Sequence, residues 1–172
     1  MSFKEELWNA ITHGVGFLIS IPVTVLLIIQ AASMNSAIHI ITFSIFGASL
    51  ILLFLMSTLL HSMPVKYKRF FAILDHSSIY ILIAGTYTPF LLIAIGGPLG
   101  ITLLSIIWSI AIFGIVFKCY FIDRYEKFSL ALYIAMGWMI VFAIKPVYAY
   151  LQVEGFTILV LGGILYTFGS IF

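Results

Sequence analysis

Long apolar runs separated by short turns dominate the sequence from residue 14 to residue 172. A helix needs about 20 apolar residues to cross a bilayer, so these runs predict six membrane-spanning helices. The runs are continuous and do not alternate with polar positions, which excludes a transmembrane β-barrel. The predicted fold class is therefore all-α, a polytopic membrane helix bundle. Its spans are expected at residues 14–32, 37–62, 71–95, 98–119, 128–149 and 155–172.

The segment before the first span, residues 2–13, has an amphipathic pattern. Ser2 and Glu5 have the spacing of a capping box, and apolar residues recur after them at helical intervals. The segment is therefore predicted to be an interfacial helix. Glu5, Asn9 and His13 are spaced four apart and can share its polar face. That face is either the rim of a functional site or an ordinary solvated surface.

Composition supports the membrane assignment. Hydrophobic residues make up 63% of the 172 residues and charged residues 8%, with a mean hydropathy of +1.24. Soluble domains carry roughly 25% charged residues, so the chain is predicted to be an integral membrane protein. No linker or composition shift divides it, and residues 1–172 are expected to form one domain. The single cysteine, Cys119, excludes an internal disulfide and a cysteine-based metal cluster.

The placement of the cations predicts the orientation. If six spans alternate, seven of the eight Lys and Arg residues fall on one side, and only Lys145 falls on the other. By the positive-inside rule, the N terminus and the two charged loops are cytosolic. The loops at 32–36 and 96–100 are short and uncharged, as expected for translocated turns. We therefore expect a multi-pass protein of the cell membrane.

Three polar residues near the predicted cytosolic face form the candidate site. Ser57 and His61 lie four residues apart on one face of the second span, and Asp75 lies about two turns into the third. The connection between these spans is short, so the helices are neighbours and the three side chains can meet. Ionisable groups are costly beside hydrocarbon, so this set requires water, a proton or a metal ion as its partner.

Each of these residues also has a structural explanation. A lone serine in a membrane helix usually bonds to its own backbone, which would make Ser57 structural. His61 can extend to the lipid headgroups, and Asp75 can pair with Lys68 or Arg69 of the adjacent loop. As a metal site, His61 would be a zinc ligand, and Asp75 would bind the metal, orient a ligand or deprotonate a metal-bound water. His61 alone does not make such a site, because a catalytic zinc takes three protein ligands.

Other notable residues are given structural roles. His76 points about 100° away from Asp75 on a helix, and His39 lies near the opposite membrane face, so both are excluded from this centre. Gly85 is expected to allow close helix packing. Kinks or helix ends are expected at the prolines within the apolar runs, Pro22, Pro89 and Pro146.

Three segments carry a resemblance to a known family. Glu5 with residues 9–14 (NAITHG), residues 57–61 (STLLH) and residues 74–89 (LDHSSIYILIAGTYTP) are similar to the hemolysin III family. That family belongs to the wider group containing the progestin and adipoQ receptors. The third segment is long and specific, and the resemblance extends over the whole chain by span number and loop lengths.

The resemblance implies a seven-helix fold with a cytosolic N terminus. Receptors of this group hold zinc near the cytosolic face through three histidines, with an aspartate linked through water. His61 matches one histidine, Asp75 the aspartate, and Ser57 the serine one turn before the histidine. The other two ligands belong to a His-x-x-x-His motif on a seventh helix, which this sequence lacks. Since the chain stops at Phe172 inside an apolar run, we expect a truncated product or fragment, with weak or absent zinc binding.

Two functions from different classes follow, and whether the chain is an enzyme stays open. The first is a zinc-dependent, membrane-embedded hydrolase of lipid amides or esters, with Asp75 as base or water holder and Ser57 hydrogen-bonding an intermediate. The second is a pore-forming cytolysin, and a receptor-like or membrane-homeostasis role is a third. A water-filled channel needs polar residues along several spans, whereas the ionisable groups here gather at one face, which favours a localised site. The expected partners are membrane lipid and a lipid substrate, with no nucleic acid and no oligomeric state specified.

Overall fold

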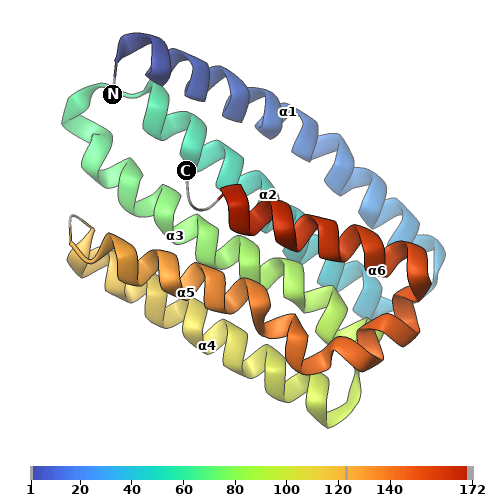
Figure 1. Ribbon diagram of the computed structural model, residues 1–172. Coiled ribbons are helices and arrows are strands. Elements are labelled where there is room, and N and C mark those ends of the chain that lie inside the picture. The colour runs from blue at the N-terminus through green and yellow to red at the C-terminus, as the bar shows by residue number, and fades with distance from the viewer. Residues whose placement is uncertain (1, 123, 170–172) are drawn as a thin grey trace.

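The computed structural model describes residues 2–122 and 124–169, and these residues form a bundle of antiparallel helices (Figure 1). Neighbouring helices in the chain pack against each other, α1 on α2, α2 on α3 and α3 on α4. The elements are α1 (Phe3–Ser33), α2 (Ala37–Ser62), α3 (Val65–Pro89), the π-helix η1 (Phe90–Ile95), α4 (Gly97–Phe121), α5 (Glu126–Trp138), the 3-10 helix η2 (Met139–Ala143) and α6 (Ile144–Gly169).

The number of spanning helices differs from the prediction. Within the described residues, five helices are long and apolar enough to cross a membrane, so the predicted six is wrong. The runs at 128–149 and 155–172 fall in one helical segment, Glu126–Gly169, apart from residues 170–172, which lie outside the described part. Polar residues around Gln152 look like a loop in the sequence, but only Gln152 itself is non-helical (φ 56°, ψ −171°). Figure 1 shows α6 turning back on itself in this region.

Helix α1 is continuous from the amphipathic segment into the first apolar run. Its capping box is confirmed: the Glu5 amide donates to Ser2 Oγ at 3.3 Å, and the Ser2 amide donates to Glu5 Oε2 at 2.7 Å. Pro22 does not interrupt the helix, whereas Pro89 is the last residue of α3 and is followed by the π-helical turn. Residues 2–13 and the first apolar run form one helix, so the helix does not mark where the membrane surface lies. The interfacial placement of residues 2–13 stays a prediction.

Helix α3 is central and packs on both sides through small residues. Toward α2, a Cβ at Gly85 would overlap Ser49, which confirms that this glycine allows close packing. Toward α4, a Cβ at Gly114 would overlap the ring of Tyr80. The most buried core lies between α3, α4 and α5 and includes Tyr80, Ile107 and Met136.

One end of the bundle carries the start of α1, the α2–α3 turn and the α4–α5 turn, on the left in Figure 1. We call it the basic end, because its cations are Lys4, Lys66, Lys68, Arg69, Lys118, Arg124 and Lys127. The predicted grouping of cations is thus present in the fold. Which side of the membrane the basic end faces stays a prediction.

Candidate functional site

An ion pair joins three helices at the basic end. His61 of α2 donates through Nδ1 to Glu6 Oε2 of α1 at 2.9 Å, and Lys68 of α3 pairs with the other oxygen of Glu6. A carboxylate only accepts hydrogen bonds, so the hydrogen of a neutral His61 sits on Nδ1 and Nε2 keeps its lone pair. The pair is sheltered, with side-chain exposures of 14% for His61 and 23% for Glu6. Glu6 therefore fixes both the ring orientation and the tautomer of His61.

Glu6 is the functional residue that sequence reasoning missed. The spacing of four favours Glu5, Asn9 and His13, but the exposed Glu5 caps the start of α1. Glu6 and His13 are seven residues apart, close to two full helical turns, so they share a face more closely than Glu5 and His13 do. That heptad spacing is the signal that identifies Glu6. Asn9 is half-buried, and its spacing from Glu6 puts it on the same face.

The imidazole of His13 lies against that of His61. The two rings are stacked, with centroids 5.8 Å apart and planes 8° apart. His13 also lies near the ring of Phe54, with a centroid distance of 6.2 Å. The structure thus brings His13 from α1 to the residue that the sequence selected on α2.

Asp75 enters the same group from α3. The buried Ser57 hydroxyl is within hydrogen-bonding reach of the Asp75 carboxyl group, and Asp75 interacts electrostatically with His13 and His61. Of the two loop cations that the structural explanation of Asp75 named, Lys68 and Arg69, Lys68 pairs with Glu6. Of the three residues selected from the sequence, Asp75 lies beside Ser57 and close enough to His61 to interact with it electrostatically. With three more they form what we call the His61 cluster: Glu6, His13, Ser57, His61, Lys68 and Asp75.

The donors of the His61 cluster do not by themselves fit a zinc site. Within residues 2–122 and 124–169, no three His, Cys, Asp or Glu side chains lie close enough to hold a metal ion. The Glu6–His61 pair resembles the carboxylate–histidine arrangement that orients metal-ligating histidines. One oriented imidazole is still short of the three protein ligands of a catalytic zinc.

Buried hydroxyls farther along the helices are engaged within their own helices. Ser20, Thr24, Ser49 and Thr88 each donate to a carbonyl three or four residues earlier, at 2.6–2.8 Å. Hydroxyls bonded in this way satisfy themselves and do not line a water path.

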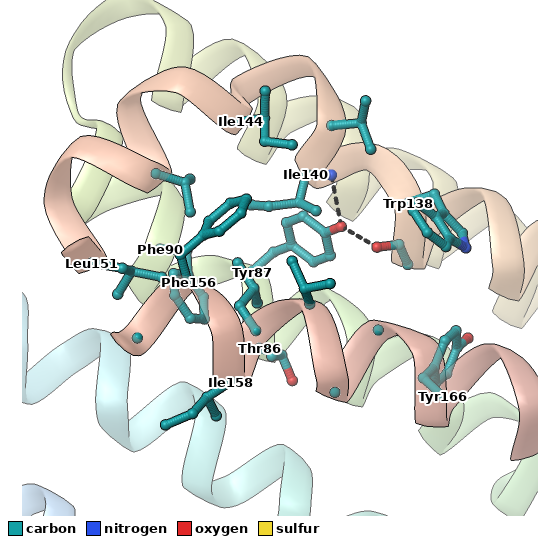
Figure 2. Close-up of a pocket in the computed structure, with 18 of the residues that line it drawn as sticks. Thr86, Tyr87, Phe90, Trp138, Ile140, Ile144, Leu151, Phe156, Ile158 and Tyr166 are labelled. Atoms are coloured by element: carbon teal, nitrogen blue, oxygen red, sulfur yellow. Dashed lines mark hydrogen bonds between the residues drawn. The ribbon is translucent and has the colours of Figure 1, made fainter. Parts of the chain in front are cut away.

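A separate, apolar cavity of about 500 Å³ lies between α3, η1, η2 and α6 (Figure 2). Phe90, Phe156 and Tyr166 are among its lining residues, and no member of the His61 cluster is. At its edge the Tyr87 hydroxyl donates to the Gly137 carbonyl at 2.6 Å and accepts from the Ile140 amide at 2.9 Å. The cavity thus lies apart from the His61 cluster, on the part of the bundle formed by the end of α3, η1, η2 and α6.

Comparison with known proteins gives consistent matches over the chain. The family model described as "Haemolysin-III related" matches residues 1–172. Hemolysin-3 of Bacillus cereus is 55% identical over 170 residues, 98% of this chain and 78% of the relative. The Hemolysin-3 homolog of Bacillus subtilis (strain 168) is 56% identical over 172 residues, covering 99% and 81%. The monocyte to macrophage differentiation factor of Homo sapiens is 28% identical over 138 residues, covering 77% and 57%. No solved structure matches.

Proposed function

This chain belongs to the haemolysin-III-related family, and from that premise we propose that it hydrolyses an amide or ester bond of a membrane lipid at the His61 cluster. The observation that carries the proposal is the convergence of α1, α2 and α3 on an oriented histidine beside a carboxyl group. Ionisable side chains inside membrane helices are expensive, so such a group is by default a functional site.

The proposed roles follow from the donors and acceptors of the cluster. Asp75 accepts a proton from a water molecule as that water attacks the carbonyl carbon of the lipid. Ser57 turns its single hydroxyl hydrogen from the Asp75 carboxyl group, which becomes protonated, to the oxygen that gains charge. The C–N or C–O bond then breaks, the proton goes to the amine or alcohol, and a fatty acid is released. His61, oriented by Glu6, presents Nε2 toward the reaction as a proton acceptor or a ligand.

The family resemblance implies a zinc ion in this site, with His61 as one of its ligands. Because the described residues do not complete a metal site, we assign no step of the reaction to the metal. Further ligands would have to come from groups outside residues 2–122 and 124–169. Metal analysis of the purified protein tests this part separately, and about one zinc per chain is the result expected for a complete catalytic site.

The proposed location is the cytosolic face of the cell membrane. The multi-pass character rests on five long apolar helices, and the orientation rests on the positive-inside rule applied to the basic end. In this orientation the His61 cluster opens toward the cytosol. A lipid of the inner leaflet would then supply the scissile bond.

The test is hydrolysis of lipid amides and esters by the purified protein in nanodiscs, with released fatty acid measured by mass spectrometry. Asp75→Asn is expected to lower the rate by about 100-fold or more, because general-base catalysis contributes on that order. Glu154→Gln changes an exposed carboxylate on α6, outside the cluster, and should leave the rate unchanged. An unfolding temperature close to that of the unchanged protein shows that Asp75→Asn still folds. Turnover by Asp75→Asn at the normal rate, or no turnover of any lipid tested, contradicts the hydrolase.

The names of the two bacterial relatives supply the alternative, a pore-forming cytolysin. Release of dye from liposomes measures lysis directly. Lysis that Asp75→Asn leaves unchanged, together with the absence of hydrolysis, would favour the pore. The self-satisfied hydroxyls along α1, α2 and α3 count against a water-filled path through these helices.

A further inference from the structure

A second polar cluster is buried on the other side of α3, between α3, α4 and α5. We call it the Lys118 cluster, and it consists of His76, Tyr80, Lys118 and Ser129. Lys118 is only 2% exposed, although its helix is otherwise apolar. It makes no hydrogen bond or ion pair with the described residues, and lysine is almost never buried without a partner.

Helix packing places these residues at the same height along the bundle. Gly114 packs on the ring of Tyr80, and α4 runs antiparallel to α3. One turn beyond Gly114 comes Lys118, and one turn before Tyr80 comes His76, so the two residues lie on facing turns and interact electrostatically. The buried Lys118 side chain therefore lies on the same side of α3 as His76 and Tyr80, at the basic end of the bundle.

Helix α5 closes the cluster from the third side. The ring of Tyr133 lies 4.4 Å from that of Tyr80 between centroids, and its hydroxyl donates to the His76 carbonyl at 2.9 Å. The Tyr80 hydroxyl has Ser129, one turn before Tyr133, and the Tyr133 side chain close to it, but it forms a hydrogen bond with neither. Buried polar side chains from three helices thus lie near one another.

Three atoms of this cluster are buried and have no hydrogen-bond partner in the described structure: His76 Nδ1, Tyr80 OH and Ser129 Oγ. Native proteins rarely leave such atoms unpaired, because a buried polar group that has lost its water and gained no partner destabilises the fold. All three can donate a hydrogen bond, and Lys118 adds three donors and a positive charge. Two carboxylates are near: Asp75 interacts with His76, and the exposed Glu126 interacts with His76 and Lys118. Neither carboxylate hydrogen-bonds the unpaired atoms.

We propose that the Lys118 cluster binds a phosphate-type oxyanion. A bound oxyanion would accept hydrogen bonds from all of these donors, which the exposed Glu126 near Lys118 does not do. The oxyanion is either the phosphate of an anionic lipid headgroup or free inorganic phosphate. A surface hollow lined by Tyr125, Glu126, Lys127 and Phe128 lies at the same α4–α5 end.

The experiment measures the unfolding temperature of the purified chain in neutral detergent while one compound is added. One arm adds inorganic phosphate, with chloride at equal ionic strength as its control. The other adds short-chain phosphatidic acid, with the matching phosphatidylcholine as its control. Binding to the folded state alone should raise the unfolding temperature saturably, by about 5 °C well above the dissociation constant. A response to phosphate identifies the small anion, and a response to phosphatidic acid alone identifies the headgroup.

Variants separate the cluster from the general charge of the basic end. Lys118→Met keeps an unbranched side chain without the charge and should abolish the shift. Tyr80→Phe removes one unpaired hydroxyl, keeps the ring and should weaken binding about tenfold. Lys127→Met removes an exposed lysine near the same turn and should leave the shift unchanged. The proposal is overturned if neither compound gives a saturable shift, or if folded Lys118→Met and Tyr80→Phe both respond like the unchanged chain.

Discussion

The Glu6 carboxylate contacts one side chain from each of two neighbouring helices, His61 through one oxygen and Lys68 through the other. Its neighbour Glu5 has the same chemistry but serves the start of α1. Since successive residues on a helix point about 100° apart, one position decides whether a carboxylate caps the helix or enters the site. At the residue scale, the angular position of a side chain on its helix thus sets its role.

Replacing Glu6 by alanine should destabilise the protein slightly, because it removes the partner of His61 and of Lys68. The pair is partly exposed, so solvent screening limits the loss to about 1 kcal/mol or less, or about 2–4 °C in unfolding temperature. Glu154→Ala is the matched control and should change it by much less. Equal unfolding temperatures for both variants, measured in the same detergent, would show that the Glu6 contacts contribute nothing.

Much of the candidate site is predictable from residue spacing, and the remainder depends on how helices are rotated. Ser57 and His61 share a face at a spacing of four, and the short turn before Asp75 makes their helices neighbours. A spacing of four does not identify Glu6 or Lys118. Glu6 is one of two adjacent glutamates, and Lys118 lies near the end of an apolar run, where a cation is ordinary. For Glu6 the signal within its own segment is the spacing of seven from His13, whereas Lys118 is selected by the packing of α4 on α3, which no single segment contains.

At the scale of elements, Tyr87 of α3 supports the change from α-helix to 3-10 helix between α5 and η2. Its hydroxyl bonds both the Gly137 carbonyl and the Ile140 amide, so it replaces a hydrogen bond that a regular helix would make within itself (Figure 2). Local propensity does not predict this change, because the group that stabilises it lies some 50 residues earlier in the chain. The same limit explains the error in the number of spanning helices, since Gln152 alone interrupts a helical segment that looks like two runs with a loop.

Tyr87→Phe should therefore destabilise the packing of η2 on α3. It leaves a half-buried carbonyl and a half-buried amide without their partner, which costs about 1–2 kcal/mol. The aromatic ring stays, so the effect isolates the hydroxyl. Tyr120→Phe, whose side chain is 77% exposed, is the control and should be nearly neutral. Hydrogen exchange of the Ile140 amide should speed up in Tyr87→Phe, and unchanged exchange would contradict this role.

At the scale of the whole molecule, both polar clusters lie at the basic end, on opposite sides of α3. The His61 cluster uses α1, α2 and α3, and the Lys118 cluster uses α3, α4 and α5. His76 follows Asp75 directly and the two interact, so adjacent residues of one helix connect the clusters. An anion bound at Lys118 is therefore placed to influence the charge state of Asp75 through this short path.

The orientation of the basic end is open to a direct test with a matched pair of serines. In a background with Cys119→Ala, Ser33→Cys places one thiol where α1 ends, and Ser62→Cys places one where α2 ends, at the basic end. Seven of the eight Lys and Arg residues lie at the basic end, so the positive-inside rule predicts that Ser62 faces the cytosol.

A membrane-impermeant maleimide should therefore label Ser33→Cys, and not Ser62→Cys, in intact spheroplasts. The pattern should reverse in inside-out vesicles, and solubilised protein should be labelled at both positions, which shows that each thiol is reactive. Labelling of Ser62→Cys in intact spheroplasts would place the basic end outside the cell. Both clusters would then face the outer leaflet, and neither an inner-leaflet substrate nor a cytosolic phosphate would reach them.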